Sequence, residues 1–394
     1  MKQKTRYLFV VLITVISCTK TQTASKPAIL SFDPVKLAAY NYVTIYGSHF
    51  DTVASKNLVS FNGQAATVFK IQGDSVLVVV VPQNVTPGKI TVTVNGVVST
   101  SESSYSVLAG SWIRKADVPD PVPPNGRVDG IGFAIGNTGY IGLGTNNGET
   151  FADLYAYDPA TNQWTAKSSL PVGLLRAFSM VINGKAYVGT GAGTGANYGN
   201  SKLFFEYDPS SDKWTPKGDF PGGIRKGASA FSVVDKGYAG LGENDNVGFK
   251  DWWQYNPSTD NWIRKSDFPG TFVPEDGFGF TLNGKIYIGG SVSLNPIINE
   301  WWQYDPAIDA WTKKKNMPWG FDYLKGVVVN NIGYLMAAES WQYDDVSDSW
   351  TQKATFGPRN FGSVFSIGNK AYYGTGLGWP STLYNTDFWE YTPD

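Results

Sequence analysis

Charged side chains recur at a fixed distance before six tyrosines in the last two thirds of the chain. A charged residue lies eleven to thirteen positions before each tyrosine. The tyrosines are Tyr140, Tyr187, Tyr238, Tyr287, Tyr334 and Tyr372. The charged residues are Arg127, Asp129, Arg176, Arg225, Lys226, Glu275, Asp276, Asp322 and Arg359. Arginine side chains bind carboxylates through two parallel hydrogen bonds, and paired carboxylates can act as general acid and base. This set therefore predicts a pocket of mixed charge that binds an anion or an acidic sugar.

Aromatic residues in Gly- and Asn-rich segments form a second candidate binding set. These segments are residues 145–152, 191–202, 242–250, 291–299 and 374–386. Among their aromatics, Tyr198, Phe249 and Trp379 are the candidates for ligand contact. Exposed aromatic rings beside amide side chains suit stacking on sugars or recognition of peptides.

Residue counts exclude several classes of chemistry. The chain has one His, His49, and one Cys, Cys18, so neither a disulfide framework nor a Cys/His metal cluster can form within it. We therefore expect no metal and no cofactor. The 32 basic and 33 acidic residues balance, which gives no electrostatic footprint for nucleic acid.

A repeat positions the charged residues. Trp112, Trp164, Trp214, Trp262, Trp311 and Trp350 are separated by 52, 50, 48, 49 and 39 residues. Each repeat has a turn with a Gly-Lys-like pair, a strand with Tyr and glycines, a variable loop, an aromatic strand and an Asp-Pro-x-x-x-x-Trp turn. A period near fifty residues is typical of propeller blades.

These motifs closely resemble kelch repeats, as in NGK at 283–285, YIGG at 287–290 and DPAIDAW at 305–311. The resemblance implies four-stranded blades in which Trp and Tyr pack blade against blade. Galactose-oxidase-like members need His and a Cys–Tyr cross-link around copper, which His49 and Cys18 cannot supply from outside the propeller. The fifth repeat, with Ala337-Ala338 in place of glycines, is expected to be the most degenerate.

Counting strands predicts how the propeller closes. Trp112 begins a fourth strand without three strands before it, and the chain ends with three strands at 361–367, 370–376 and 387–392. The two ends complete one blade, which gives six blades over 111–394 and removes an open sheet edge. Strand order places the long loops and the blade-to-blade loops on one face. Because the fourth strand starts at the other face, we expect the preceding domain on that other face.

Residues 28–108 predict an immunoglobulin-like β-sandwich. Seven short apolar runs lie at 28–32, 42–46, 58–61, 66–71, 76–81, 89–94 and 104–108, and Asn62-Gly63 and Asn95-Gly96 favour type I′ turns. The segments ILSFDP at 29–34, VTIYGSHF at 43–50 and VSFNG at 59–63 resemble the IPT/TIG family. His49 is interpreted as a turn residue.

The first 18 residues are interpreted as a signal peptide. Lys2, Lys4 and Arg6 precede an apolar run at 7–17, and the segment VISC at 15–18 resembles the bacterial lipobox. The resemblance implies lipid attachment at Cys18, followed by a polar tether at 19–27. We therefore expect a monomer in the bacterial cell envelope, at the outer membrane or cell surface, that meets the membrane through its lipid anchor alone.

These features favour a binding protein whose loop face holds a glycan or a cell-surface protein, with the sandwich as a spacer. An enzyme stays open as the alternative. A sialic-acid mutarotase of the kelch type would use Glu275 and Asp276 as acid and base, and Arg127, Arg176, Arg225 and Arg359 as a carboxylate clamp. A two-carboxylate glycosidase and a purely structural protein also stay open.

Overall fold

The computed structural model describes residues 26–120, 126–146, 148–193, 199–245, 247–271, 276–290, 299–318, 324–357, 359–378 and 384–394. Within them the fold is almost entirely β, apart from one short 3-10 helix, η1 (Ala54–Lys56). No helix of this part of the chain is long and apolar enough to cross a membrane.

The N-terminal domain is an immunoglobulin-like sandwich whose sheet nearly closes on itself. Its strands are β1 (Ala28–Asp33), β2 (Lys36–Leu37), β3 (Tyr42–Ser48), β4 (Asn57–Phe61), β5 (Gln64–Gln72), β6 (Val76–Val80), β7 (Ile90–Val94), β8 (Val97–Thr100) and β9 (Ser106–Val107). Seven of them follow the order β1-β3-β6-β5-β4-β7-β8, and β2 pairs in parallel with β9. The backbone N–H of Ile29 in β1 donates to Ser99 Oγ in β8 at 3.2 Å, so the two ends of the sheet meet.

The expected sandwich strands are largely present. Left-handed φ values of 46° at Asn62 and 86° at Gly63, and of 49° at Asn95 and 79° at Gly96, agree with the expected type I′ turns. Strands β2 and β8 were not anticipated. Both are short, and the exposed residues within them weaken the apolar signal on which sequence analysis depends.

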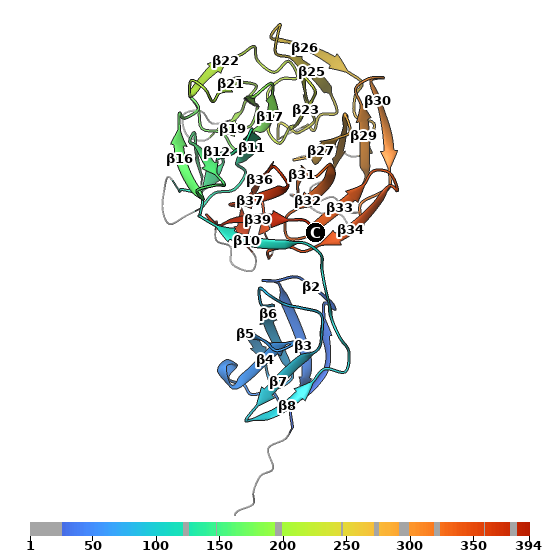
Figure 1. The fold of residues 1–394 in the computed structure, drawn as a ribbon. Helices are drawn as coiled ribbons and strands as arrows, with labels where there is room; N and C mark the ends of the chain where they lie inside the picture. The colour runs from blue at the N-terminus through green and yellow to red at the C-terminus, as the bar shows by residue number, and fades with distance from the viewer. Residues whose placement is uncertain are drawn as a thin grey trace, which may run out of the picture.

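The C-terminal domain is a propeller of six four-stranded blades, numbered here in chain order (Figure 1). Blade 1 has β11 (Ile131–Ile135), β12 (Thr138–Gly142), β15 (Leu154–Asp158) and β16 (Gln163–Lys167); blade 2 has β17 (Phe178–Ile182), β18 (Lys185–Gly189), β21 (Phe204–Asp208) and β22 (Lys213–Pro216). Blade 3 has β23 (Ser229–Val233), β24 (Lys236–Gly240), β25 (Trp252–Asn256) and β26 (Asn261–Lys265); blade 4 has β27 (Phe278–Leu282), β28 (Lys285–Gly289), β29 (Trp301–Asp305) and β30 (Ala310–Lys314). Blade 5 has β31 (Lys325–Val329), β32 (Ile332–Met336), β33 (Ser340–Asp344) and β34 (Ser349–Lys353); blade 6 has β36 (Ser363–Ile367), β37 (Lys370–Gly374), β39 (Phe388–Thr392) and β10 (Ser111–Lys115).

The loops that follow the second strands contain short strand pairs. These are β13 (Thr145–Asn146) with β14 (Glu149–Thr150), and β19 (Ala192–Gly193) with β20 (Gly199–Asn200). In blade 6, β35 (Arg359–Asn360) pairs with β38 (Leu377–Gly378), which joins the loop before the first strand to the loop after the second. The blade-to-blade loops and the long loops therefore share one face, as expected; we call it the long-loop face.

Blade 6 confirms the expected closure. Strand β10 pairs antiparallel with β39, so Trp112 lies opposite Tyr391 although the two residues come from opposite ends of the chain. The indole of Trp112 donates to the carbonyl of Ala354 in the preceding blade at 2.8 Å. The sheet of blade 6 therefore has strands from both ends of the propeller domain.

The repeated Trp and Tyr residues join neighbouring blades. In blade 2, Tyr207 donates its hydroxyl hydrogen to Asp212 at 2.8 Å, and the same carboxylate accepts the backbone N–H of Ser168 in the loop before the blade at 3.0 Å. The indole of Trp214 donates to the carbonyl of Ser168 at 2.8 Å. The corresponding Tyr–Asp hydrogen bond recurs in blades 3, 4 and 5. The turn between the third and fourth strands therefore links a blade to the loop that precedes it.

The sandwich lies beside the rim of the propeller, next to blades 5 and 6 (Figure 1). Tyr40 packs edge-on against Trp389 at 5.0 Å between ring centroids, and Ala38 is buried in one cluster with Trp112 and Phe356. Trp389 is the second residue of β39, just after the long loop of blade 6. These contacts therefore lie toward the long-loop face. The expectation that the sandwich sits on the opposite face was wrong. Blade 5 has only residues 337–339 between β32 and β33, and this short loop leaves room for the sandwich.

Candidate functional site

The charged residues found from the tyrosine alignment separate into two layers. Thirteen positions before the tyrosine, Arg127, Arg225 and Arg359 are tied to an acid that precedes the third strand of the same blade. The ion pairs are Arg127–Asp153 at 2.6 Å, Arg225–Asp251 at 2.6 Å and Arg359–Asp387 at 2.7 Å. These bonds lock the blade-to-blade loop to the long loop.

Arg127 and Arg225 are buried, with 2% and 0% of their surface exposed. Each makes a second bond to the same carboxylate, and each donates to a backbone carbonyl, of Leu143 and Leu241 respectively. The ring of Phe249 lies 4.0 Å from the Arg225 guanidinium carbon and covers it. Because the guanidinium groups of both arginines are buried and bound to carboxylates and carbonyls, we do not propose these two arginines for ligand contact. Phe249 is half-buried, and its ring packs on Arg225.

Eleven positions before the tyrosine, a different layer forms the mouth of the central channel. The residues there have left-handed φ values of 57° at Asp129, 51° at Arg176, 65° at Gly227, 52° at Asp276 and 59° at Phe361. Four of their backbone N–H groups donate to the carbonyl of the previous blade's residue, with distances of 3.1 Å for Asp129 to Phe361, 2.9 Å for Arg176 to Asp129, 2.9 Å for Gly227 to Arg176 and 3.0 Å for Asp276 to Gly227. This chain of hydrogen bonds fixes the spacing of charges around the mouth.

An ion-pair network connects blades 2, 3 and 4 at the mouth. Arg176 contacts Asp276 at 2.5 Å and Glu243 at 3.3 Å, and Lys226 contacts the same Glu243 at 3.5 Å. The Arg176–Asp276 pair spans blade 3 over Gly227, where a Cβ atom would lie 2.8 Å from Asp276 Oδ1. Glycine at this position therefore makes room for the pair.

Asp129 is the titratable group of the mouth with the most altered acidity. Burial raises its pKa, and the neighbouring carboxylate of Asp276 raises it further. Lys325 and Arg176 oppose this effect, and the resulting pKa of Asp129 is about 6. A carboxyl group with this pKa is protonated in part near neutral pH, so it can donate as well as accept a hydrogen bond.

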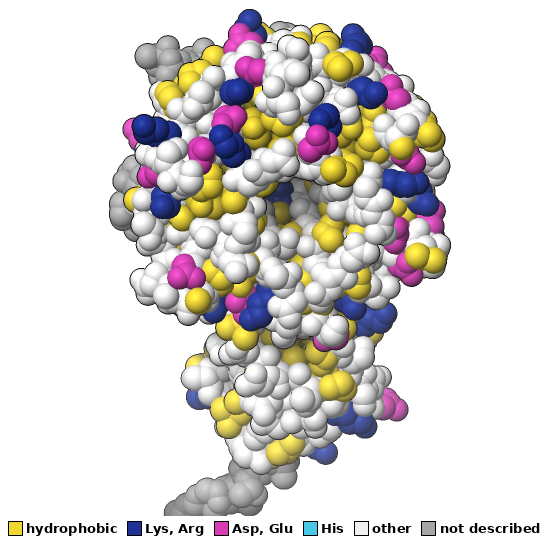
Figure 2. Space-filling view, turned by 45° about the horizontal axis from the view of Figure 1, so that its top comes forward, with side chains coloured by type: hydrophobic (Ala, Val, Ile, Leu, Met, Phe, Trp, Pro, Cys, Tyr) yellow, Lys and Arg dark blue, Asp and Glu magenta, His cyan; other side chains and the backbone are white. Residues whose placement is uncertain are grey.

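A cavity of about 150 Å³ lies in the channel at this mouth and is walled by the innermost strands of the blades. A second cavity, of about 340 Å³, shares part of its lining and extends along the channel. Small residues such as Gly132, Ser179, Ala230 and Gly279 line both cavities and keep the centre open. Figure 2 shows the central hollow of the propeller, and acidic and basic side chains lie farther out on the surface of the blades.

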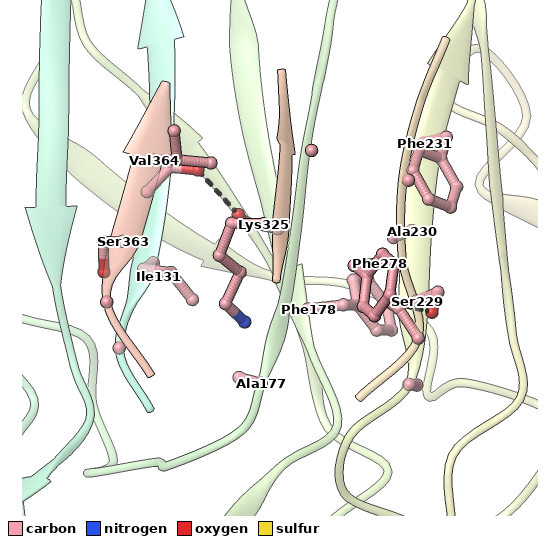
Figure 3. A pocket seen from close by; sticks show the side chains of 18 residues that line it. Ile131, Ala177, Phe178, Ser229, Ala230, Phe231, Phe278, Lys325, Ser363 and Val364 are labelled. Carbon is pink, nitrogen blue, oxygen red and sulfur yellow. Dashed lines mark hydrogen bonds between the residues drawn. The ribbon is translucent and has the colours of Figure 1, made fainter. Parts of the chain in front are cut away.

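Lys325 is the basic residue in the wall of this cavity. In Figure 3 its side chain points into the cavity toward Ala177. The same position, nine residues before the tyrosine, holds the buried residues Ile131, Phe178, Ser229, Phe278 and Ser363 in the other blades. No hydrogen bond or ion pair of the Lys325 ammonium group exists among the described residues. Its charge therefore faces the cavity without a direct ion-pair partner, and the carboxyl group it influences is that of Asp129, whose pKa it lowers.

Sequence analysis missed Lys325 although the tyrosine alignment contained the signal. Lys325 lies nine residues before its tyrosine, inside the first strand, whereas the expected site residues lie eleven to thirteen residues before it. A single Lys in a column of apolar and Ser residues marks a break in the packing pattern. Five expected site residues, Cys18, Tyr198, Glu275, Asp322 and Trp379, lie outside the described residues.

Within the described ranges, no group of three or more His, Cys, Asp or Glu side chains is arranged to hold a metal ion. The fold and the mouth together define a six-bladed β-propeller with an immunoglobulin-like domain at its rim and a charged central channel mouth. The sandwich segment, residues 27–108, matches the family model of the IPT/TIG domain.

Among solved structures, the structure of YjhT is similar to this chain with a TM-score of 0.58 and 17% sequence identity. The match covers 68% of this chain and 95% of that chain. At this identity the likeness shows the fold alone. Comparison with curated proteins finds no match.

Proposed function

We propose that this protein binds a carboxylate-bearing ligand, such as an acidic sugar of a glycan, at the channel mouth of its propeller. The observation that carries the proposal is the ammonium group of Lys325, which points into the channel cavity and forms no direct hydrogen bond or ion pair among the described residues. A cation without a direct ion-pair partner in a concave site attracts an anion, and the neighbouring Asp129, when protonated, can donate a hydrogen bond to that anion.

Three finer features complete the proposed function. The blades are of the kelch type, the sandwich acts as a spacer, and a lipid on Cys18 anchors the chain in the bacterial envelope. The support is the repeat pattern, the position of the sandwich beside the rim and the lipobox-like VISC segment. The protein acts as a monomer that presents the mouth to a glycan or to a carboxylate of a cell-surface protein.

The test compares acidic with neutral sugars and the unaltered protein with a variant that lacks the charge of Lys325. Residues 27–394 are titrated with a sialic acid, a uronic acid and neutral galactose by calorimetry. The acids should bind and galactose should not. Lys325→Met keeps the length of the side chain and removes its charge, so it should weaken acid binding by about ten- to a hundredfold. Lys236→Met, on the opposite face, is the matched control and should bind normally. Equal affinity of Lys325→Met and the unaltered protein would remove the basis of the proposal.

A catalytic role at the same mouth is the second candidate, and the pKa of about 6 at Asp129 favours it. A group that gains and loses a proton near neutral pH suits general acid–base catalysis of sugar ring opening, as in a mutarotase. The earlier choice of Asp276 as acid or base is less suitable, because Arg176 holds that carboxylate in an ion pair. Exchange between the anomers of a sialic acid, followed by NMR, should be faster with the protein than without it, and Asp129→Asn should abolish the difference.

A further inference from the structure

A second cavity outside the channel lies between the sandwich and blade 5. Its volume is about 520 Å³, within the range of small-ligand clefts. The sandwich lines it with residues 33–36, Asn41 and Tyr42, and blade 5 lines it with Ala338, Glu339, Gln352 and Thr355. We call it the interdomain cleft.

The acid at the position of Glu339 binds a cation in other blades. The acid directly precedes the third strand, and the indole two residues later donates to it, at 2.6 Å for Trp253 to Asp251, 3.1 Å for Trp302 to Glu300 and 2.7 Å for Trp389 to Asp387. Each of these carboxylates also holds a cationic side chain: Arg225 at 2.6 Å, Lys313 at 2.7 Å and Arg359 at 2.7 Å respectively. The carboxylate and the indole thus form a cation-binding site, which in these three blades is occupied by an Arg or Lys side chain of the propeller itself.

A cation of the fourth strand lies over the indole in the same three blades. The distances to the ring centroid are 5.7 Å for Arg264 over Trp253, 5.7 Å for Lys313 over Trp302 and 5.9 Å for Arg114 over Trp389. Two positions therefore supply positive charge to this site, one in the loop before the blade and one in its fourth strand.

Blade 5 keeps the acid and the indole but has neutral residues at both positions. Trp341 donates to Glu339 at 3.0 Å, as the corresponding indoles do in blades 3, 4 and 6. Gln352 lies opposite Trp341 in the strand register, where Lys313 lies opposite Trp302 in blade 4. At the loop position the sequence has Phe321, which is outside the described residues.

No ion pair to Glu339 exists within the described part of the chain. Burial raises the pKa of Glu339, and no cation counteracts this, because a hydrogen bond from Trp341 is the single lowering influence. Lys36 and Asp33 also line the cleft, and both are exposed. With Asp33 and Glu339 against Lys36, the charge of the lining is negative.

We propose that the interdomain cleft binds an arginine or lysine side chain of a partner protein, with Glu339 as its counter-ion. The incoming cation takes the place that Lys313 and Arg225 occupy in blades 4 and 3. The cleft is open where the propeller omits its own cation, and it is separate from the channel mouth, so this site does not depend on the carboxylate-binding proposal.

The experiment uses the full chain and two peptides, Gly-Arg-Gly-amide and its citrulline counterpart, which has the same shape without the charge. By NMR titration the arginine peptide should bind at least about tenfold more tightly than the citrulline peptide. Glu339→Gln should reduce its affinity to the citrulline level while carboxylate binding at the channel mouth is unchanged. Equal affinity of the two peptides, or full affinity in Glu339→Gln, would overturn the proposal.

A positive charge added to the fourth strand of blade 5 gives an independent test of Glu339 as the counter-ion. Gln352→Lys installs the ion pair that Lys313 and Glu300 form in blade 4, so it should raise the melting temperature and abolish arginine-peptide binding. Thr351→Lys adds the same charge on the exposed neighbouring residue of the strand and is the matched control, expected to bind normally. If Gln352→Lys binds the peptide as well as Thr351→Lys does, Glu339 is not the counter-ion.

Discussion

Arg225 and Asp251 form a two-pronged ion pair across 26 residues of sequence, with oxygen–nitrogen distances of 2.6 Å and 3.0 Å. The guanidinium is fully buried between the rings of Phe220 and Phe249, at 4.9 Å and 4.0 Å from their centroids. The bond fastens the loop that enters blade 3 to the loop that enters its third strand. Arg225 is thus part of the support of the long-loop face.

Removing one partner of this pair should destabilise the propeller strongly. Arg225→Ala leaves the largely covered carboxylate of Asp251, 12% exposed, without its counter-ion, and breaking such a pair typically costs up to about 3–5 kcal/mol of unfolding free energy. Urea denaturation measures the loss. Arg264→Ala breaks the exposed Arg264–Asp267 pair at 2.9 Å and is the control, with an expected loss below about 1 kcal/mol. Similar midpoints for the two variants would show that the buried pair has no special role in stability.

The repeat explains why so much of the fold was predictable. Tyr and Trp at fixed spacing, Asp-Pro turns and the unmatched strand at Trp112 each have a local or counting signature, so they indicated six closed blades. The site was less predictable. Arg225 lies thirteen residues before its tyrosine and Arg176 lies eleven before its own. Arg225 is buried, whereas Arg176, which has a left-handed backbone, faces the channel mouth. Sequence spacing alone does not distinguish these two environments.

The position of the sandwich depended on tertiary packing that no repeat encodes. The strand that follows the sandwich does start at the face opposite the long loops, as reasoned from Trp112. The contact of Tyr40 with Trp389 nevertheless holds the sandwich beside the rim. Such a contact between distant residues of two domains has no periodic signal in the sequence.

The shared blade predicts cooperative unfolding on truncation. Deleting residues 387–394 removes β39, which pairs with both β10 and β37. Strand β10 would then have no partner in blade 6, and the edges of β10 and β37 would be exposed. We expect the truncated protein to melt well below the full chain or to aggregate, as measured by calorimetry. Removing Asp394 alone is the control. A normal melting temperature after deletion of the whole strand would contradict the role of β39 in closing the ring.

The proposed lipid attachment at Cys18 predicts how the protein partitions. Cys18→Ala should move the protein from the membrane fraction to the soluble fraction, because the chain's single thiol is then absent. Incorporation of labelled palmitate should be lost in the same variant. Cys18→Ser is the conservative control and should behave in the same way. Labelled protein in either variant would place the lipid elsewhere or show that the VISC segment is not a lipobox.

Asp129 predicts a pH-dependent stability at the channel mouth. Its pKa is raised from 3.8 to about 6 in the folded protein, chiefly by burial. The contribution of such a group to stability is fully present below pH 3.8 and is lost as the pH rises through about 6. At pH 8 the buried charge therefore destabilises the fold, by about 1–3 kcal/mol for a shift of this size.

Asp129→Asn removes this titration and keeps a residue that tolerates the left-handed backbone at this position. The variant should be more stable than the unaltered protein at pH 8, and the difference should shrink toward zero at pH 4. Urea unfolding at both pH values measures it, with Asp117→Asn as a control, since Asp117 forms an exposed pair with Arg114. The same protonation makes binding of an acidic sugar tighter at pH 5 than at pH 8 in the unaltered protein, whereas Asp129→Asn should show no such change. Parallel stability profiles for the variant and the unaltered protein would mean that Asp129 keeps an ordinary acidity and does not serve as the proton donor of the mouth.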